Sequence, residues 1–368
     1  MYNFIINNLR WLTAGALLTF LSSFGQTYFI SIFSGEIRNT FNLSHGDWGS
    51  IYGFGTFASA IVMIWAGGLT DIMRVRKLGP IVLFALAASC LFMAFNPLVI
   101  LLPVVIFCLR LTGQGMSTHI SAVAMSRWFV SNRGKALSVA NLGFSIGEAL
   151  IPILLVSALV YFAWQEIWII AALITLLAIP ILIWLLRQER SPQSIDAEDQ
   201  SLGMNNRHWN RKQTLFHPLF WFMMPAFIGQ SAFNTAFFFL QVHFSEIKGW
   251  GHFDLVAMFV AFLLFAYGDT LLMTLIGFIF LGITSGANTT LPNAFWAEFF
   301  GTKYLGTIKA AAAAAMVLGS AIGPAITGLL LDFDISLDIQ YVGISIFFAF
   351  SSALMLIGIS QSKVHLSK

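Results

Sequence analysis

Residues 79–95 read GPIVLFALAASCLFMAF, an uncharged and almost wholly apolar run that decides the fold class. As a helix, about 20 predominantly apolar residues cross the hydrocarbon core of a bilayer. Across the chain 58% of the residues are hydrophobic and only 10% are charged, and the mean hydropathy is +0.82. Soluble domains carry about 25% charged residues. The composition therefore excludes a water-soluble fold and predicts an all-α integral membrane protein.

Apolar runs of similar length recur on both sides of this segment and predict about ten full transmembrane helices. The first run is too long for a removable signal peptide and is interpreted as a retained span. Six runs precede a polar stretch and four follow it: Trp11–Phe33, Ile51–Leu69, Gly79–Phe95, Leu98–Met125, Ala136–Phe162, Ile167–Leu186, Leu219–Val242, Leu271–Ala297, Gly306–Leu331 and Tyr341–Ile359. This pattern predicts a six-helix bundle at 1–186, a central cytoplasmic loop at 187–216 and a second bundle at 217–368.

One further apolar run, Leu255–Tyr267, is too short to span comfortably, because its 13 residues reach only about 20 Å as a helix. The placement of Lys and Arg tests whether it crosses, since short cytoplasmic loops carry the excess of these residues. With ten crossings and a cytoplasmic N-terminus, all of the 19 lie inside except Arg38 and Lys248 outside and Arg110 within the membrane. An eleventh crossing would move four lysines outside. The charge pattern thus predicts ten crossings and two cytoplasmic termini.

The two predicted bundles contain corresponding motifs in the same order. Residues 25–29, GQTYF, are echoed by residues 229–233, GQSAF, while Gly115 in the fourth span corresponds to Gly286. The two offsets differ, so the second bundle is shorter by roughly 33 residues, a helix plus a loop, around residues 255–270. Two explanations stay open. Either a piece is missing and the short run packs at the interface or against the bundle, or the two halves have diverged.

The loop after the second span carries the most specific motif. It reads Gly67-Gly68-Leu69-Thr70-Asp71-Ile72-Met73-Arg74-Val75-Arg76-Lys77. This loop resembles the signature GxLxDRxGRR of the major facilitator superfamily, and it departs from the signature at Ile72 and Arg74. The segment Arg110–Gly115 is similar to the family's fourth-span RxxxGxG motif. The segment Gly143–Glu148 is similar to its fifth-span GxxxGP motif, with Glu148 in place of proline.

The resemblance implies two parallel repeats of six helices, shortened in the second half, that perform secondary transport by alternating access. The stretch Trp128–Ala136 resembles a loop of bacterial members near the oxalate/formate and monocarboxylate group. A monomeric symporter or antiporter of the bacterial cytoplasmic (inner) membrane is therefore expected. Its expected partners are a small-molecule substrate, protons and the lipid bilayer. No cofactor is expected, and the net charge of only +3 argues against nucleic acid.

Arg110 is predicted near the middle of the fourth span, where an uncompensated charge costs at least about 2.5–3.5 kcal/mol. Its predicted partner is Glu148, because a hairpin of spans four and five places the two side chains within about 6 Å in depth. In the functional interpretation Arg110 binds substrate and the pair acts as a proton-sensitive switch. The alternatives are a fixed pair that joins two helices and a Glu148 that stays protonated.

Further polar side chains are predicted either to line a midplane substrate site or to form interhelical hydrogen bonds. In a regular helix Gln114, Ser117 and Ser121 share a face with Arg110. The other candidates for substrate contact come from both halves: Gln26, Tyr28, Gln230, Asn234, Asn288 and Asn293. His119 has no second ligand at i+3 or i+4, so no metal site is expected.

Two groups of residues are assigned to movement and packing. A cytoplasmic gate is predicted at Asp71, Arg74, Arg76 and Lys77, although basic loops also fix topology. Close packing and bending of two helices are predicted at Gly143, Gly147, Gly319, Gly323 and Pro324.

The sequence predicts a secondary active transporter of a small organic solute, and Arg110 favours a carboxylate. The alternative is a non-transporting membrane sensor or an inactive truncated relative, because a shortened second half would remove one lateral wall. No enzyme is expected, since the sequence offers no nucleophile–base set. The cysteines Cys90 and Cys108 both lie in apolar runs, which excludes a disulfide framework and a cysteine-based metal cluster.

Overall fold

The computed structural model describes residues 2–129, 132–188, 203–207, 209–247, 276, 295–296, 299–301 and 305–364. Within these ranges the chain is helical and contains no strand, only an isolated bridge between Gly203 and Arg207. The predicted short run Leu255–Tyr267 and most of the predicted span Leu271–Ala297 lie outside the described residues.

The first half contains the broken first span and five further spans. Its elements are α1 (Tyr2–Asn7), α2 (Leu9–Leu21), η1 (Ser22–Gly25), α3 (Thr27–Ile30), η2 (Ser31–Phe33), α4 (Ser34–Phe41), α5 (His45–Ala66), α6 (Leu69–Ile72), α7 (Val75–Phe95), η3 (Val99–Leu101), α8 (Leu102–Leu109), η4 (Arg110–Ser117), α9 (Thr118–Trp128), α10 (Arg133–Ala158) and α11 (Trp164–Leu185). In the described part of the second half these are η7 (Met204–Asn206), α12 (Arg211–Leu215), α13 (Pro218–Ile247), α17 (Leu305–Asp332) and α18 (Leu337–Lys363).

Seven of the described helices are long and apolar enough to cross a membrane, and the bent first span makes eight. They correspond to predicted spans one to six and to the last two predicted spans, while α13 covers the predicted seventh span. The helices begin and end where local chemistry dictates. For example, the Ser44 side chain accepts from the Asp47 backbone N–H and caps α5, and left-handed Asn42 (φ 54°) ends α4.

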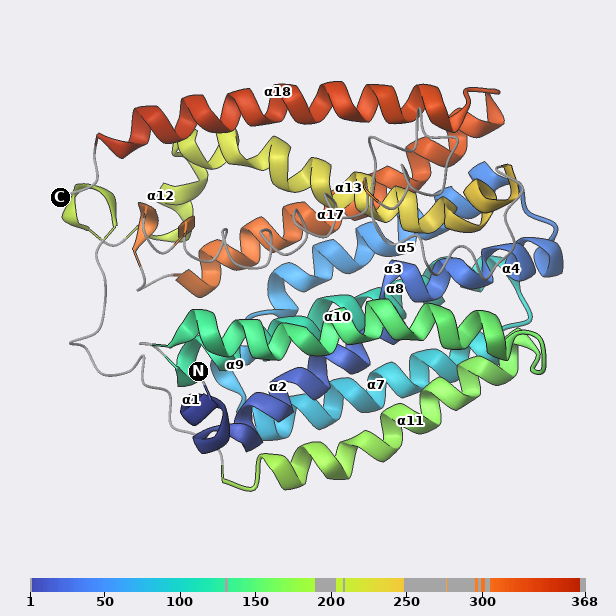
Figure 1. Ribbon diagram of the computed structural model, residues 1–368, viewed down its shortest axis with the longest axis horizontal. Coiled ribbons are helices and arrows are strands. Elements are labelled where there is room, and N and C mark those ends of the chain that lie inside the picture. Colours follow the sequence, from blue (N-terminus) through green and yellow to red (C-terminus); the bar gives the residue numbers. More distant parts are fainter. Residues whose placement is uncertain are drawn as a thin grey trace.

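The helices form two bundles that pack in equivalent ways. In the first bundle α2 packs on α10 and α11, and in the second α13 packs on α17 and α18 (Figure 1). Helices α5 and α17 make the main contact between the bundles. We call the end of the molecule that carries both chain termini the terminal side (left in Figure 1). The end that carries the α4–α5 turn and the end of α17 is the far side.

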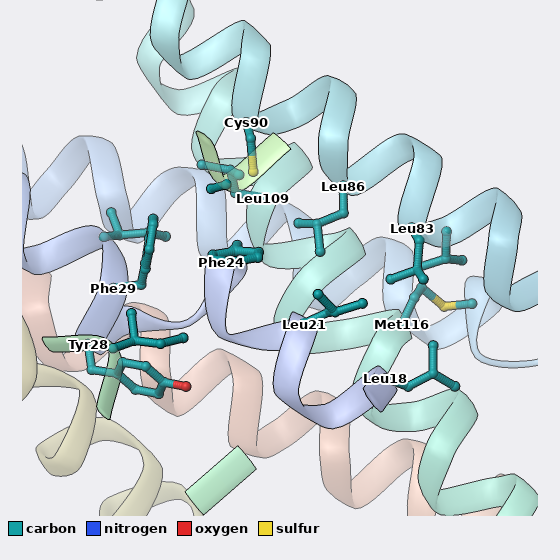
Figure 2. Packing of buried hydrophobic residues seen from close by; sticks show 14 of the residues in the cluster. Leu18, Leu21, Phe24, Tyr28, Phe29, Leu83, Leu86, Cys90, Leu109 and Met116 are labelled. Atoms are coloured by element: carbon teal, nitrogen blue, oxygen red, sulfur yellow. The ribbon is translucent and has the colours of Figure 1, made fainter. Parts of the chain in front are cut away.

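A single large cluster of buried side chains holds the first bundle together. Figure 2 shows its centre, where side chains of the first span meet those of α7 and the fourth span: Leu18, Leu21, Phe24, Leu83, Leu86, Cys90, Leu109 and Met116. A second, smaller cluster joins Met204 and Trp209 of the central segment to α13 and Trp296. The first cluster surrounds the part of the molecule where the polar side chains of the candidate site lie.

Candidate functional site

The first span is broken in the middle of its length. Leu9–Gly25 and Thr27–Phe41 are inclined by 43°, and Gln26 between them has an extended backbone (φ −87°, ψ 155°). A break of this kind frees backbone polar groups, which is tolerated at membrane depth only where protein covers them. Gln26 and its neighbours Gly25 and Thr27 are all buried.

The fourth span covers this break. Arg110–Ser117 of that span is a π-helix, so it carries a local widening where a regular α-helix was expected. A Cβ atom on Gly113 would lie 2.6 Å from the Gly25 Cα, and one on Gly25 would collide with the Leu109 carbonyl. The two spans therefore touch backbone to backbone, and only glycine fits at either position. Both irregular segments are thus held against each other.

Arg110 is buried in this crossing, with 1% of its side chain exposed. Its Nη1 donates to the Gly25 carbonyl and to the Thr27 hydroxyl, both at 3.2 Å. Its Nη2 donates to the Ser320 hydroxyl of α17 at 3.0 Å, and its Nε has no hydrogen-bond partner among the described residues. Arg110 therefore connects the break in the first span to the second bundle.

The predicted ion pair between Arg110 and Glu148 is not formed. All the hydrogen-bond acceptors of Arg110 within the described structure are neutral oxygens. Glu148 is half-buried on α10 and lies close enough to the Tyr28 hydroxyl to interact with it electrostatically. Spacing along the two helices gives only the depth of each side chain in the membrane. Rotation about the helix axes points Arg110 towards α3 and α17 instead of Glu148.

Aromatic side chains pack around the Arg110 guanidinium. The centre of the Arg110 guanidinium lies 5.4 Å from the centroid of the Tyr52 ring, and the Tyr52 hydroxyl and the Thr27 hydroxyl share a 2.8 Å hydrogen bond. Phe239 of α13 packs against both Tyr52 and Trp48, at ring-centroid distances of 4.9 and 5.8 Å. Helix α13 therefore contributes a second contact from the other bundle, beside Ser320.

The other polar residues of the first half surround this centre without forming one chain. The Gln26 side chain donates to the Ser22 hydroxyl at 3.4 Å, and the Tyr28 hydroxyl donates to Ser23 at 2.7 Å. Gln114 is half-buried, and its Oε1 has no partner within the described structure. Two serines of the fourth span instead donate to backbone carbonyl oxygens. The Ser121 hydroxyl donates to the Gly15 carbonyl at 2.9 Å, and the Ser117 hydroxyl donates to the Thr112 carbonyl at 2.8 Å.

The second-half candidates are less completely placed. Gln230 and Asn234 lie on α13, but their side chains are not among those described. Asn288 and Asn293 lie outside the described residues. Their assignment as substrate contacts stays a prediction.

The predicted gate residues form contacts within the first bundle. Arg74 is the residue before α7, and Arg74, Arg76 and Lys77 are exposed on the terminal side. Arg76 donates to the Arg187 carbonyl at 3.3 Å, at the end of α11. Asp71 lies in α6, and its side chain is not described. Among the described side chains of this group, none forms a hydrogen bond with the second bundle.

The predicted packing glycines face the same kind of neighbour in both bundles. A Cβ atom on Gly143 would collide with the Ala16 carbonyl of α2, and one on Gly323 with the Ala232 carbonyl of α13. Gly147 and Gly319 likewise contact the first span of their own bundle, at Ser23 and Ile228. The Pro324 carbonyl instead touches α5 of the opposite bundle, because a Cβ on Gly49 would lie 2.7 Å from it.

Four residues of this centre escaped the sequence analysis: Thr27, Tyr52, Phe239 and Ser320. Nothing in their local sequence marks them, since single hydroxyl and aromatic residues are common in apolar spans. The echo around Gly319 and Gly323 was a usable signal for Ser320, which lies between them. That echo predicts close packing at the two glycines but does not indicate a role for the hydroxyl between them.

Two bundles of long apolar helices, with a buried arginine between them, define a polytopic membrane protein. The chain belongs to the Major Facilitator Superfamily, whose family model matches residues 15–268. This finding confirms the predicted fold class and family. The nearer resemblance, to the oxalate/formate and monocarboxylate group, stays a prediction. The search of the curated proteins found no match to the sequence.

Solved transporters share the fold at low sequence identity. A bacterial homologue of the human lysosomal transporter Spinster, in an inward-facing and unoccupied conformation, aligns with a TM-score of 0.70 at 14% identity, covering 98% of each chain. The nucleoside transporter NupG aligns with a TM-score of 0.61 at 12% identity, over 95% of this chain and 99% of that one. The human organic anion transporter MFSD10 gives 0.59 at 15% identity, over 95% and 98%. At these identities the likeness shows the fold alone.

Proposed function

We propose that the protein is a secondary active transporter of a small organic carboxylate, coupled to protons and working by alternating access. The observation that carries the proposal is Arg110: a charge with 1% exposure whose hydrogen-bond acceptors are neutral and come from both bundles. In this family the substrate site lies near the middle of the membrane, between the two halves, and Arg110 lies between the two bundles.

Among the described residues the Arg110 guanidinium hydrogen-bonds only to neutral oxygens, and this suits a carboxylate ligand better than a neutral one. A buried charge without a counter-ion is costly, and a bound anion would offset that cost. Arginine binds carboxylates through two parallel N–H groups. The Nε of Arg110 has no partner among the described residues, and its Nη2 has only the Ser320 hydroxyl. A substrate carboxylate bound to Nε and Nη2 of Arg110 would contact the first bundle through Arg110 and the second through Ser320.

Proton coupling is assigned to Glu148. Its half-buried carboxyl lies near Tyr28, which is part of the first span just after the break at Gln26. Uptake or loss of a proton there would change the charge beside the same broken segment that Arg110 holds. Coupling between the two groups would therefore act through the first span, since they do not touch.

The remaining predictions complete the proposal. The bundles at 1–186 and 217–368 would move about a central loop at 187–216, with the terminal side in the cytoplasm of a bacterial cell and Asp71, Arg74, Arg76 and Lys77 at its gate. Gln26, Tyr28, Gln114, Gln230, Asn234, Asn288 and Asn293 are proposed to shape the site. We propose a monomer in the inner membrane.

The test is uptake of radiolabelled mono- and dicarboxylates, sugars and amino acids into proteoliposomes with an imposed pH gradient. We expect saturable, gradient-driven uptake of a carboxylate. Arg110→Lys keeps the charge but loses the two-pronged geometry, so its KM should rise at least about tenfold. Arg38→Lys, the same change away from the site, is the matched control.

Two results would contradict the proposal. An unchanged KM in Arg110→Lys would remove Arg110 from the substrate site. A folded protein that takes up none of these solutes would favour the alternative, a non-transporting sensor or an inactive relative.

A further inference from the structure

Asp332, the last residue of α17, lies at the first turn of α5 in the opposite bundle. Its Oδ2 accepts hydrogen bonds from the Gly46 backbone N–H at 3.0 Å and from the Ser44 hydroxyl at 3.3 Å. The N-terminus of a helix carries a partial positive charge and attracts carboxylates. Asp332 therefore makes a charge-assisted contact between the bundles at the far side of the molecule.

Helix α5 does not need Asp332 in order to begin. The Ser44 Oγ accepts from the Asp47 backbone N–H, and the Asp47 carboxylate accepts from the Ser44 backbone N–H, both at 3.0 Å. This reciprocal pair is a complete capping box within α5 itself. The Gly46 N–H is an additional donor that water can satisfy once the bundles separate. Loss of Asp332 should thus leave α5 folded.

Glycines on α5 let this helix approach α17 closely. On α5, Gly46, Gly49 and Gly53 recur along one face that meets α17. Figure 1 shows the two helices packed against each other. A Cβ atom on Gly46 would collide with the Asp332 carboxylate, and one on Gly53 would lie 3.0 Å from the Ala321 carbonyl. Tight backbone packing of this kind adds attraction but no charge. Among the described residues of the α5–α17 contact, Asp332 supplies the charged group.

We propose that Asp332 is a positioning residue that holds the far side of the carrier closed by capping α5 across the bundle interface. The proposal rests on alternating access, in which this side must open during each cycle. In the open arrangement Asp332 and Gly46 are both hydrated, and α5 keeps its own cap. Asp332 then adjusts the balance between the two arrangements without contacting substrate.

The experiment measures that balance directly and needs no substrate. Spin labels are placed at exposed Thr40 and Ser336, one on each bundle at the far side, in full-length protein with Cys90 and Cys108 replaced by alanine. Inter-label distances are recorded by pulsed electron resonance in lipid nanodiscs. We expect Asp332→Ala to raise the ratio of long-distance to short-distance populations at least about twofold. Asp332→Asn, which keeps an acceptor oxygen, should give a smaller increase.

Two variants make the result specific. Gly46→Ala places a methyl group against the Asp332 carboxylate and should shift the population in the same direction. Asp334→Asn removes an equal charge two residues away and should shift nothing. Unchanged distances in Asp332→Ala and Gly46→Ala, or an equal shift in Asp334→Asn, would overturn the proposal. Because no substrate is present, a carrier that fails to transport but shows the expected shifts would refute the proposed function alone.

Discussion

Helices α10 and α17 occupy equivalent places in the two bundles but do different things. Residues 142–149 read LGFSIGEA and residues 318–325 read LGSAIGPA. In both, the two glycines let the helix lie directly on the first span of its own bundle. Two of the three positions that differ bear on the contacts of the helices: Phe144 corresponds to Ser320, and Glu148 to Pro324.

Those two exchanges separate the roles of the bundles. Phe144 packs edge-on against Tyr28 within the first bundle, with ring centroids 5.9 Å apart, whereas Ser320 accepts a hydrogen bond from Arg110 across the interface. Glu148 keeps an ionisable group on α10, whereas the Pro324 carbonyl touches α5. A shared packing device therefore leaves the neighbouring positions open to diverge, one helix towards a titratable group and the other towards the opposite bundle.

The largest effect should come from breaking the part that the two helices share. Gly143→Ala and Gly323→Ala each push a methyl group into a backbone carbonyl and should lower the free energy of unfolding by about 1–3 kcal/mol. Gly343→Ala on α18 has no atom within 4 Å of the new methyl group and should be neutral or stabilising by up to about 1 kcal/mol. Denaturant unfolding in detergent micelles measures all three. Similar costs at Gly143 and Gly323 confirm equivalence; a cost at only one contradicts it.

The next test removes Glu148, the ionisable group that α10 carries where α17 has Pro324. Glu148→Gln should abolish proton-driven accumulation, a loss of at least about tenfold, while downhill exchange continues because the rest of the site is unchanged. Accumulation and exchange are both measured in proteoliposomes, with the exposed Asp338→Asn as a control. Accumulation that survives in Glu148→Gln would mean that the coupling proton binds elsewhere.

Ser320 is the corresponding test on α17. Ser320→Ala removes the Nη2 acceptor of Arg110 and should lower stability by about 1–1.5 kcal/mol. Ser320→Thr keeps the hydroxyl and should recover most of this loss. Thermal unfolding of the detergent-solubilised variants measures both changes in stability. Equal stabilities of the alanine and threonine variants would show that this hydrogen bond contributes little.

The smallest effect is expected at Tyr52. Tyr52→Phe loses the hydrogen bond to Thr27 but keeps the ring beneath Arg110 and against Phe239, so it should cost about 0.5–1 kcal/mol. Tyr52→Leu removes the aromatic contact as well and should cost more. The same unfolding assay separates the contribution of the hydrogen bond from that of the aromatic ring. Equal losses of stability in Tyr52→Phe and Tyr52→Leu would contradict a contribution from the ring.

Hydropathy predicts the spans because a helix needs about 20 apolar residues to cross the hydrocarbon core. The described spans agree with the predicted ones, but their ends do not always coincide. Helix α5 begins at His45, whereas its predicted span began at Ile51, because the capped first turn is polar. The capping pattern of Ser44 and Asp47 was present in the sequence and would have placed the start correctly.

The partners of Arg110 could not be predicted in the same way. Spacing along a helix gives depth in the membrane, but the direction of a side chain also depends on rotation, and the π-helix at Arg110–Ser117 changes that rotation locally. The acceptors then come from a helix break and from a distant helix, neither of which hydropathy detects. The contact of Asp332 with Gly46 joins residues 286 positions apart, so local patterns carry no trace of it.

The contact between Gly25 and Gly113 also sets an order for biogenesis. The Gly25 carbonyl receives its hydrogen bond from a side chain 85 residues further along the chain. At about 5–20 residues per second, the ribosome needs roughly 4–17 s to add that length. During this interval the first span is in the membrane without the segment that covers its break. The contact that covers this break can therefore form only after the fourth span has been synthesised.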